Sequence, residues 1–202
     1  MDISVEDFNV DDITPRSISC IIGNVKSGKS TLIKDILSVV SKKYPNHVIC
    51  TDREHKQNYY SKFIDGKKMY NRYSSIITNR CFFNNMVLVL DNCLPHKLYI
   101  EEIYDNYQGK DMVILLSCLK FYNDINYDFI FISQFNNVQE IYKIYTMYVA
   151  KFDVSAEQFV ELIKFCTTDN EILVINCHSL FLEELFMTYK ADLHEDLDLR
   201  DD

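Results

Sequence analysis

The chain of 202 residues is 48% hydrophobic and 25% charged, which suits one well-buried globular domain and excludes two large ones. Its net charge of −9 excludes a uniformly basic nucleic-acid coat protein, so any nucleic-acid contact must come from a local patch. The acidic N-terminus lacks an apolar signal region, and no run reaches the roughly 18 apolar residues of a membrane span, so we expect an intracellular protein. Seven cysteines without a CxxC pair indicate reduced thiols and argue against structural zinc.

Short apolar runs alternate with longer amphipathic stretches along the chain. The runs predict strands at residues 17–22, 47–51, 86–91, 112–119, 129–133 and 171–177. They are rich in Val, Ile and Leu, and most do not alternate with polar residues, which is typical of a parallel sheet covered on both faces. Helical spacing and capping patterns predict helices over residues 29–43, 97–107, 138–149, 155–166 and 179–189. The order predicts an α/β three-layer sandwich with a mostly parallel central sheet, formed by one domain over residues 1–190 and followed by an acidic flexible tail over residues 191–202.

A phosphate-binding motif lies between the first predicted strand and the first predicted helix. Residues 23–31 match GxxxxGK[ST] at every fixed position, and the flanking strand and helix are the context that this motif requires. The glycines let successive backbone N–H groups point at phosphate oxygens, and the helix N-terminus adds the positive end of its dipole. Lys29 is expected to contact the β and γ phosphates, and Ser30 to bind Mg²⁺. The sequence therefore predicts binding of ATP with Mg²⁺ through the loop residues Gly23, Asn24, Val25, Lys26, Ser27, Gly28, Lys29, Ser30 and Thr31.

The third predicted strand ends in an acidic residue, which is a second candidate for the site. The apolar run Met86–Asp91 ends in a carboxylate, as a Walker B strand does, so Asp91 is expected to hold Mg²⁺ together with Ser30. An ordinary strand-end aspartate that caps a turn is the alternative. Asn92 comes next, and an amide cannot accept the proton of an attacking water. Glu101 and Glu102 are weaker candidates for that base, because both fit the solvent-facing side of a helix.

The order of these elements resembles the DNA-packaging ATPases of large nucleocytoplasmic DNA viruses, a poxvirus-, iridovirus- and mimivirus-like branch of the FtsK/HerA-type motors. VLVLDNCL at residues 87–94 looks like their VLDDCL element, and YDFIFIS at residues 127–133 looks like their DYVFI strand. Residues 112–118 resemble their sensor strand, and the similarity spans roughly residues 8–178. The resemblance implies a RecA/FtsK-like P-loop NTPase fold, ATP hydrolysis, and packaging of viral genomic DNA by a homo-oligomeric ring.

The chain departs from this family at four places. Asn92 stands where the family has a second acid, and Cys118 stands near its usual Gln. Residues 108–111 replace a Gly-Arg-His stretch, and residues 122–126 lack the Arg that a neighbouring subunit would use. The resemblance and these departures leave two functions open. One is a motor with Lys29, Asp91 and Asn92 at its catalytic positions, and the other is an ATP-binding pseudo-ATPase with a structural or assembly role and little turnover. A small-molecule kinase is a third candidate, although no arginine-rich lid or DR[ST]-like acceptor stretch supports it.

A basic segment at residues 42–80 is the candidate for contact with double-stranded DNA. It holds nine cations against three acids, with six aromatic residues between them. Cations neutralise phosphates and aromatic rings stack on bases, but the same pattern also fits a solvated connection whose rings pack on the domain. The cations are Lys42, Lys43, Arg53, Lys56, Lys62, Lys67, Lys68, Arg72 and Arg80, and the rings are Tyr44, Tyr59, Tyr60, Phe63, Tyr70 and Tyr73. Arg72 and Arg80 are the candidates for an arginine that acts on a neighbouring subunit. The resemblance further implies capsid proteins as partners and the host cytoplasm (viral factory), with the virion as a second location.

Overall fold

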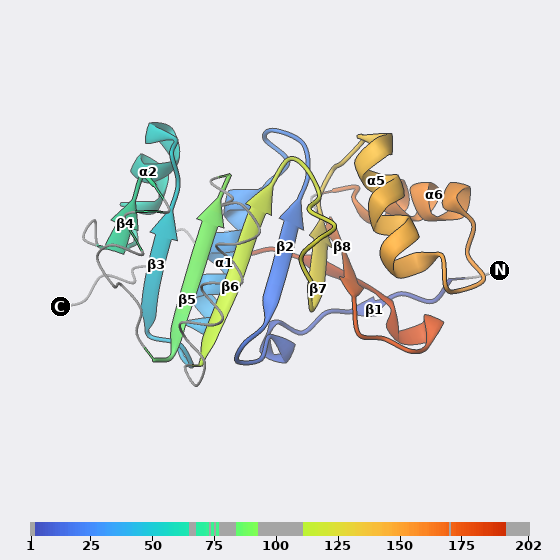
Figure 1. The fold of residues 1–202 in the computed structure, drawn as a ribbon, viewed down its shortest axis with the longest axis horizontal. Helices are drawn as coiled ribbons and strands as arrows, with labels where there is room; N and C mark the ends of the chain where they lie inside the picture. Colours follow the sequence, from blue (N-terminus) through green and yellow to red (C-terminus); the bar gives the residue numbers. More distant parts are fainter. Residues whose placement is uncertain are drawn as a thin grey trace.

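The computed structural model describes residues 3–64, 68–72, 74, 76, 84–92, 111–169 and 171–192. The strands within these residues form one mixed sheet with the order β1-β9-β8-β7-β2-β6-β5-β3-β4 (Figure 1). In chain order the strands are β1 (Glu6–Asp7), β2 (Ile18–Ile22), β3 (Asn46–Cys50), β4 (Met69–Tyr70), β5 (Met86–Asp91), β6 (Met112–Cys118), β7 (Phe129–Ile132), β8 (Glu171–Asn176) and β9 (Phe186–Lys190). The helix predicted over residues 97–107 and the tail beyond residue 192 lie outside the described residues.

The middle of the sheet is parallel. β2 lies between β6 and β7, and β5 lies between β6 and β3, with every one of these pairs parallel. β8 then pairs antiparallel with both β7 and β9. The prediction of a mostly parallel sheet is confirmed. Because parallel strands end at the same edge of the sheet, the carboxyl ends of β2, β5, β6 and β7 all lie at that edge.

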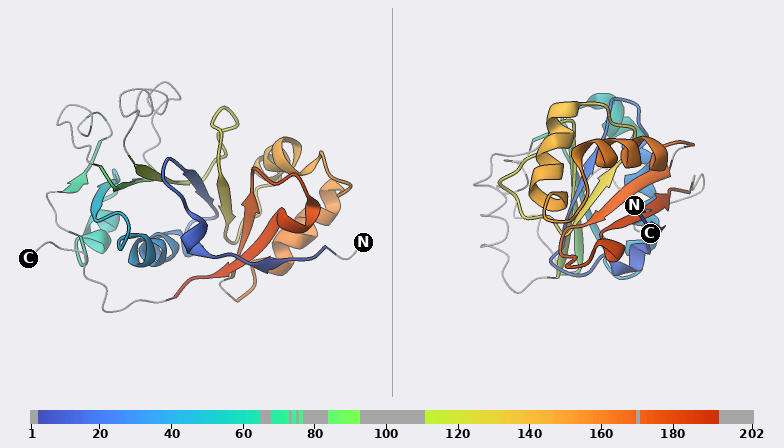
Figure 2. Two further views of the ribbon diagram at one scale, coloured as in Figure 1. Left: turned by 90° about the horizontal axis from the view of Figure 1, so that it is seen from below. Right: turned by 90° about the vertical axis from the view of Figure 1, so that its right-hand side faces the viewer.

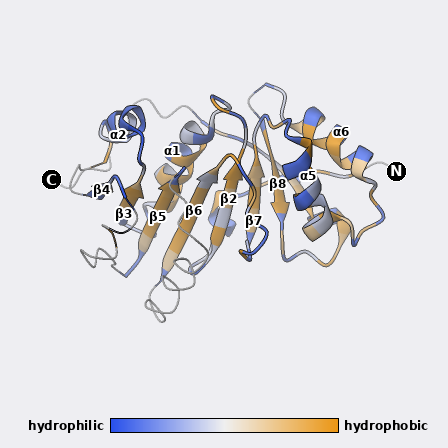
Figure 3. Cartoon of the chain, turned by 45° about the horizontal axis from the view of Figure 1, so that its top comes forward, coloured by the Kyte–Doolittle hydropathy of each residue, from blue (hydrophilic) through white to orange (hydrophobic). Residues whose placement is uncertain are grey.

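Helices cover both faces of the sheet and create two separate cores. Alternate residues of a strand face opposite sides, so Ile21 packs with α1 (Lys29–Val40), whereas Cys20 and Ile22 pack with α5 (Val138–Ile144) and α6 (Ala156–Cys166). The short helix α2 (Glu54–Tyr60) lies on the α1 face. Figure 2 shows these layers from two further sides, and Figure 3 shows that the central strands are largely apolar. The three-layer α/β sandwich is therefore confirmed.

The predicted capping of α6 is present. The Ser155 hydroxyl accepts from the backbone N–H of Gln158 at 3.2 Å, and the Gln158 side chain accepts from the backbone N–H of Ser155 at 2.8 Å. The helix predicted over residues 138–149 is also present, but its second half, Tyr145–Val149, is π-helical. Sequence periodicity does not distinguish such a turn from an α-helix.

The helix predicted over residues 179–189 is wrong. This segment holds a short 3₁₀ turn, Leu182–Glu184, followed by β9. The Leu and Glu content of the segment favours a helix, but β9 gains a ladder with β8 on one side and with β1 on the other. Phe186 is fully buried in the core beneath α6, where its ring stacks on Phe159. Tertiary pairing therefore outweighs local propensity here.

Candidate functional site: a phosphate loop and a buried carboxylate

The phosphate loop (residues 23–31) has the backbone that its sequence predicts. It leaves the buried strand β2 and enters α1, with Lys26 at φ 65° and Gly28 at φ 85°. Such left-handed residues turn neighbouring N–H groups toward one point, which makes a concave site for an anion. Gly28 is the residue directly before the helix, so the helix dipole adds positive potential at the same place.

Residues after β7 anchor the loop on one side. The Asn24 N–H donates to the carbonyl of Gln134 at 2.9 Å, and the hydroxyls of Ser27 and Ser133 lie 2.7 Å apart. A Cβ atom on Gly23 would lie 1.9 Å from the Ser133 Oγ, so this position has no room for any side chain. Glycine at position 23 is therefore favoured by the close approach of the Ser133 and Ser27 side chains. Ser133 and Gln134 were not predicted to belong to the site.

Lys29 is buried under the loop. Its Nζ donates to the carbonyls of Gly23 at 2.8 Å and Asn24 at 2.5 Å. Burial and then the nearby Lys56 ammonium lower the pKa of Lys29 to about 8, and the Asp91 carboxylate opposes this shift.

Asp91 lies at the tip of β5, as predicted, and is completely buried. Its Oδ2 accepts hydrogen bonds from the Lys56 Nζ at 2.8 Å and from the Tyr60 hydroxyl at 2.9 Å. Its Oδ1 accepts from the Asn92 Nδ2 at 2.8 Å. Both carboxylate oxygens are therefore already bonded to protein donors, as a buried charge requires.

The same Lys56 ammonium also donates to the Ser30 hydroxyl. The structure thus brings the two predicted metal ligands, Ser30 and Asp91, to one place but joins them through a lysine. A hydroxyl and a carboxylate have the right chemistry for Mg²⁺. The ammonium nevertheless takes the position between them, so the site as it stands does not fit a magnesium ion. Groups of three or more His, Cys, Asp or Glu side chains that could hold a metal are absent from the described part of the chain.

Asn92 and Cys118 have different surroundings. Asn92 has φ 58°, its N–H donates to the carbonyl of Ser117 at 2.8 Å, and it borders the cavity described below. Cys118 is buried at the end of β6, and its Sγ lies 3.6 Å from that of Cys20 in the core. Asn92 is therefore part of the site, whereas the thiol of Cys118 packs below it.

A cavity of about 540 Å³ opens above the phosphate loop. Loop residues 25–31 form its floor, and Asn92 and Leu119 border it from the ends of β5 and β6. The segment that begins α2 adds a third wall of basic side chains, Arg53, His55 and Lys56. The volume lies within the usual range for small-molecule sites, and the cations suit a polyphosphate.

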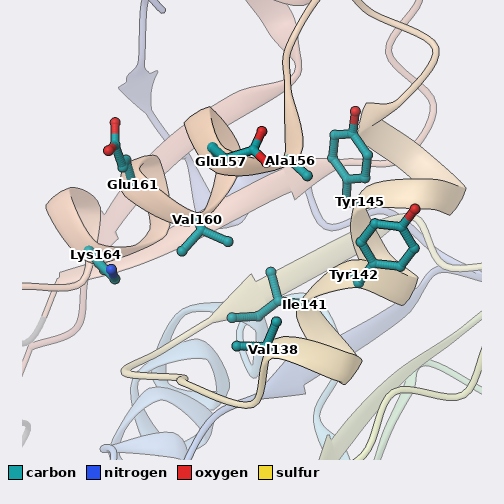
Figure 4. A pocket seen from close by; sticks show the side chains of 9 residues that line it. All are labelled: Val138, Ile141, Tyr142, Tyr145, Ala156, Glu157, Val160, Glu161 and Lys164. Carbon is teal, nitrogen blue, oxygen red and sulfur yellow. The ribbon is translucent and has the colours of Figure 1, made fainter.

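A second groove, of about 470 Å³, lies between α5 and α6 (Figure 4). Val138, Ile141 and Val160 form much of its wall, and Tyr142 and Tyr145 border it. Glu157 and Glu161 add negative charge to the α6 side. Mostly apolar walls with two carboxylates and one lysine, Lys164, suit a triphosphate less well than the cavity above the phosphate loop, which is therefore the candidate nucleotide site.

The basic segment at residues 42–80 is not one connecting loop. It contains β3, α2 and β4 within the described residues, whereas Lys67, Tyr73 and Arg80 lie outside them. Three of the rings expected to stack on bases, those of Tyr44, Tyr60 and Phe63, are buried in the core. For these three rings the stacking interpretation is wrong and the alternative, packing on the domain, is confirmed, because the rings cover the sheet.

Several of the cations in the segment do reach solvent. Lys42, Lys43, Lys62 and Arg72 are exposed, and Lys43 pairs with Asp11 at 2.8 Å. Lys56 is different, because its side chain is only 14% exposed and lines the cavity above the phosphate loop. The assignment of Lys56 to a DNA surface is therefore wrong.

Besides Ser133 and Gln134, the sequence did not reveal that Lys56, Tyr60 and Arg53 belong to the site. Lys56 and Tyr60 lie on α2 and Arg53 directly before it; this segment follows β3, a neighbour of β5 in the sheet, but is distant from Asp91 in the chain. Strand order decides this proximity, and no short motif encodes it. A lysine and a tyrosine four residues apart, on one side of a helix, were the only local signal.

The sequence matches no protein-family model, and no curated protein is significantly similar to it. Solved structures do match. The genome packaging NTPase B204 from Sulfolobus turreted icosahedral virus 2, in complex with AMPPCP, has a TM-score of 0.61 at 18% identity, over 87% of this chain and 98% of that one. B204, the DNA-packaging ATPase from Sulfolobus turreted icosahedral virus, has a TM-score of 0.60 at 19% identity, over 89% and 99%. The ATP-gammaS complex of the former has a TM-score of 0.60 at 17% identity, over 88% and 98%.

The arrangement of the strands and helices, together with the phosphate loop, is that of a P-loop NTPase fold. More particularly, the chain has the fold of the B204 packaging NTPases along nearly its whole length. Within the described residues, no helix has the length and apolar character needed to cross a membrane.

Proposed function

We propose that this protein binds ATP at the phosphate loop and hydrolyses it to drive viral genomic DNA into virions. The observation that carries the proposal is the phosphate loop itself, with its left-handed Lys26 and Gly28 and its buried Lys29, at the carboxyl edge of a parallel sheet. The likeness in fold to B204, which is a packaging NTPase crystallised with AMPPCP and ATP-gammaS, supports the choice of reaction.

The loop would hold the phosphates through its N–H groups and the N-terminus of α1. Lys29 would leave the carbonyls of Gly23 and Asn24 and donate to the β and γ phosphates instead. This exchange requires little movement, because Lys29 already lies beneath the loop. Asp91 would orient the groups around the γ phosphate through its partners Lys56 and Asn92.

A pseudo-ATPase that uses bound ATP for assembly is the second candidate, and one observation favours it. Asn92 has an amide in place of a carboxylate, and its N–H donates to Asp91. Both carboxylate oxygens of Asp91 already accept hydrogen bonds from protein donors, so neither is free to take a proton from water. Under this proposal ATP binding would order an interface with a second copy or with a capsid protein, and turnover would be slow.

For the motor, we propose contact with double-stranded DNA through the exposed cations of the basic segment, which include Lys42, Lys62 and Arg72. Assembly into a homo-oligomeric ring would place several such patches around one duplex. Arg72 is exposed and is a candidate for the arginine that reaches a neighbouring nucleotide. The protein would work in the host cytoplasm, at the viral factory, and the virion is a second proposed location.

Steady-state ATP hydrolysis, measured with and without double-stranded DNA, tests the proposal. Lys29→Ala is the blank, and Lys164→Ala, an exposed lysine on α6, is the matched control. We expect turnover that DNA stimulates in the wild type and in Lys164→Ala, and none in Lys29→Ala. ATP binding with turnover no higher than the blank would favour the pseudo-ATPase, and absence of ATP binding would overturn both.

A further inference from the structure

Lys56 lies where a metal ion lies in the expected chemistry of a phosphate loop. Its Nζ donates hydrogen bonds to the hydroxyl of Ser30, the residue after Lys29, and to the Asp91 carboxylate at 2.8 Å. These are the two protein groups that sequence reasoning assigns to Mg²⁺. The ion pair is well shielded, since the Asp91 side chain is fully buried and that of Lys56 is only 14% exposed.

The surroundings of Asp91 hold this arrangement in place. The Tyr60 hydroxyl donates to the same carboxylate oxygen as Lys56, and Asn92 donates to the other. Tyr60 is itself fully buried among the rings of Tyr59 and Phe63. A metal bound to Oδ2 would have to displace Lys56 or Tyr60, and Oδ1 already accepts from Asn92. Asp91 is thus built to bind an ammonium.

Lys56 also has a donor left for a ligand. An ammonium has three N–H groups, and the bonds to Ser30 and Asp91 use two of them. Lys56 borders the cavity above the phosphate loop, so the third N–H is available to an oxygen of a bound phosphate. Its single positive charge would then lie between Ser30, Asp91 and the nucleotide, as the charge of Mg²⁺ would.

We propose that Lys56 is a built-in cation that replaces Mg²⁺ in nucleotide binding by this protein. The inference rests on the proposed function, because it assumes that a nucleoside triphosphate occupies the cavity. Its consequence is specific: ATP binds without a divalent metal, and removal of the Lys56 charge makes binding depend on the metal.

Calorimetric titration of the full chain with ATP, in Mg²⁺ and in EDTA, tests this directly. For the wild type we expect dissociation constants that agree within about threefold between the two conditions. For Lys56→Met we expect binding in EDTA to weaken by about ten- to a hundredfold, the loss typical of a charge-assisted hydrogen bond, and Mg²⁺ to restore most of it. Lys164→Met, which removes an exposed lysine from α6, should behave as the wild type.

The outcomes separate the two proposals. Wild-type protein that binds ATP in Mg²⁺ but more than about tenfold weaker in EDTA overturns the inference and leaves the phosphate loop intact as a nucleotide site. A Lys56→Met variant that binds ATP more tightly in Mg²⁺ than the wild type also overturns it, because Lys56 would then compete with the metal. A wild type that binds no ATP in either condition overturns the proposed function itself. The wild-type comparison needs no variant, so it holds even if Lys56→Met fails to fold.

Discussion

Removal of one hydroxyl group tests the buried cluster around Asp91. The Tyr60 hydroxyl donates to the Asp91 Oδ2 at 2.9 Å, and both side chains are fully buried. In Tyr60→Phe the ring remains in edge-to-face contact with Tyr59 and Phe63, whose centroids are 5.4 and 5.9 Å away. The substitution therefore removes a hydrogen bond to a charged group and almost no packing.

The expected cost follows from that difference. A hydrogen bond to a charged group contributes roughly 1.5–3 kcal/mol, and no water can replace a donor at a site with no exposed surface. Lys56 still donates to the same oxygen, which places the estimate near the lower half of that range, at about 2 kcal/mol. For a chain of this length such a loss lowers the Tm by about 4–8 °C.

Thermal and urea unfolding, followed by circular dichroism because the chain has no tryptophan, measure the change. Tyr142→Phe is the matched control, since it removes the same atom from a ring that is 59% exposed and should change the free energy of unfolding by less than about 0.5 kcal/mol. If Tyr60→Phe is no more destabilised than Tyr142→Phe, the hydroxyl does not bond an ionised Asp91, and the account of this cluster is refuted.

Other predictions concern the loop, a helix cap and a thiol. Gly23→Ala places a methyl group 1.9 Å from the Ser133 Oγ, so we expect ATP affinity to fall by more than about tenfold, with partial recovery in Gly23→Ala/Ser133→Gly; equal affinity in calorimetry would contradict the packing. Gly28→Asn should unfold at a higher temperature than Gly28→Ala, because φ 85° suits Asn better than Ala and the position has open space; the reverse order would count against a left-handed residue there. Ser155→Ala removes the capping box of α6 and should cost about 1 kcal/mol in urea unfolding, whereas no change would show that the cap is dispensable. Burial raises the pKa of Cys166 to about 11, so alkylation followed by mass spectrometry should be slow at pH 8 and should accelerate about tenfold per pH unit up to that pKa; rapid labelling at pH 8 would refute it.

The local parts of the protein were readable from the chain. The phosphate loop, its strand and helix, the Asp91 strand end and the capping box of α6 are each set by residues within about a dozen positions of one another. Glycine positions, a capping pattern and an unbroken apolar run act through backbone sterics and short hydrogen bonds, which any stretch of chain carries with it.

Long-range pairing was not readable. The segment before Lys190 has a helix-forming composition but becomes β9, because β8 and β1 offer it two ladders. Tyr44, Tyr60 and Phe63 resemble a stacking surface in the sequence, yet they cover the sheet. In both cases the free energy comes from burial against partners far away in the chain, which local propensity does not contain.

The candidate nucleotide site likewise has one part that the sequence determines and another that the tertiary structure determines. Residues 23–31 by themselves predict a phosphate site, since the N–H groups, the helix dipole and Lys29 all lie in one short segment. The position of the Lys56 ammonium beside this loop depends on strand order, because β3 lies next to β5 and thereby brings α2, with Lys56 and Tyr60, against Asp91. The electrostatic energy of that cluster depends on the distances between its charged groups and on their burial, and the spacing of residues along the chain predicts neither.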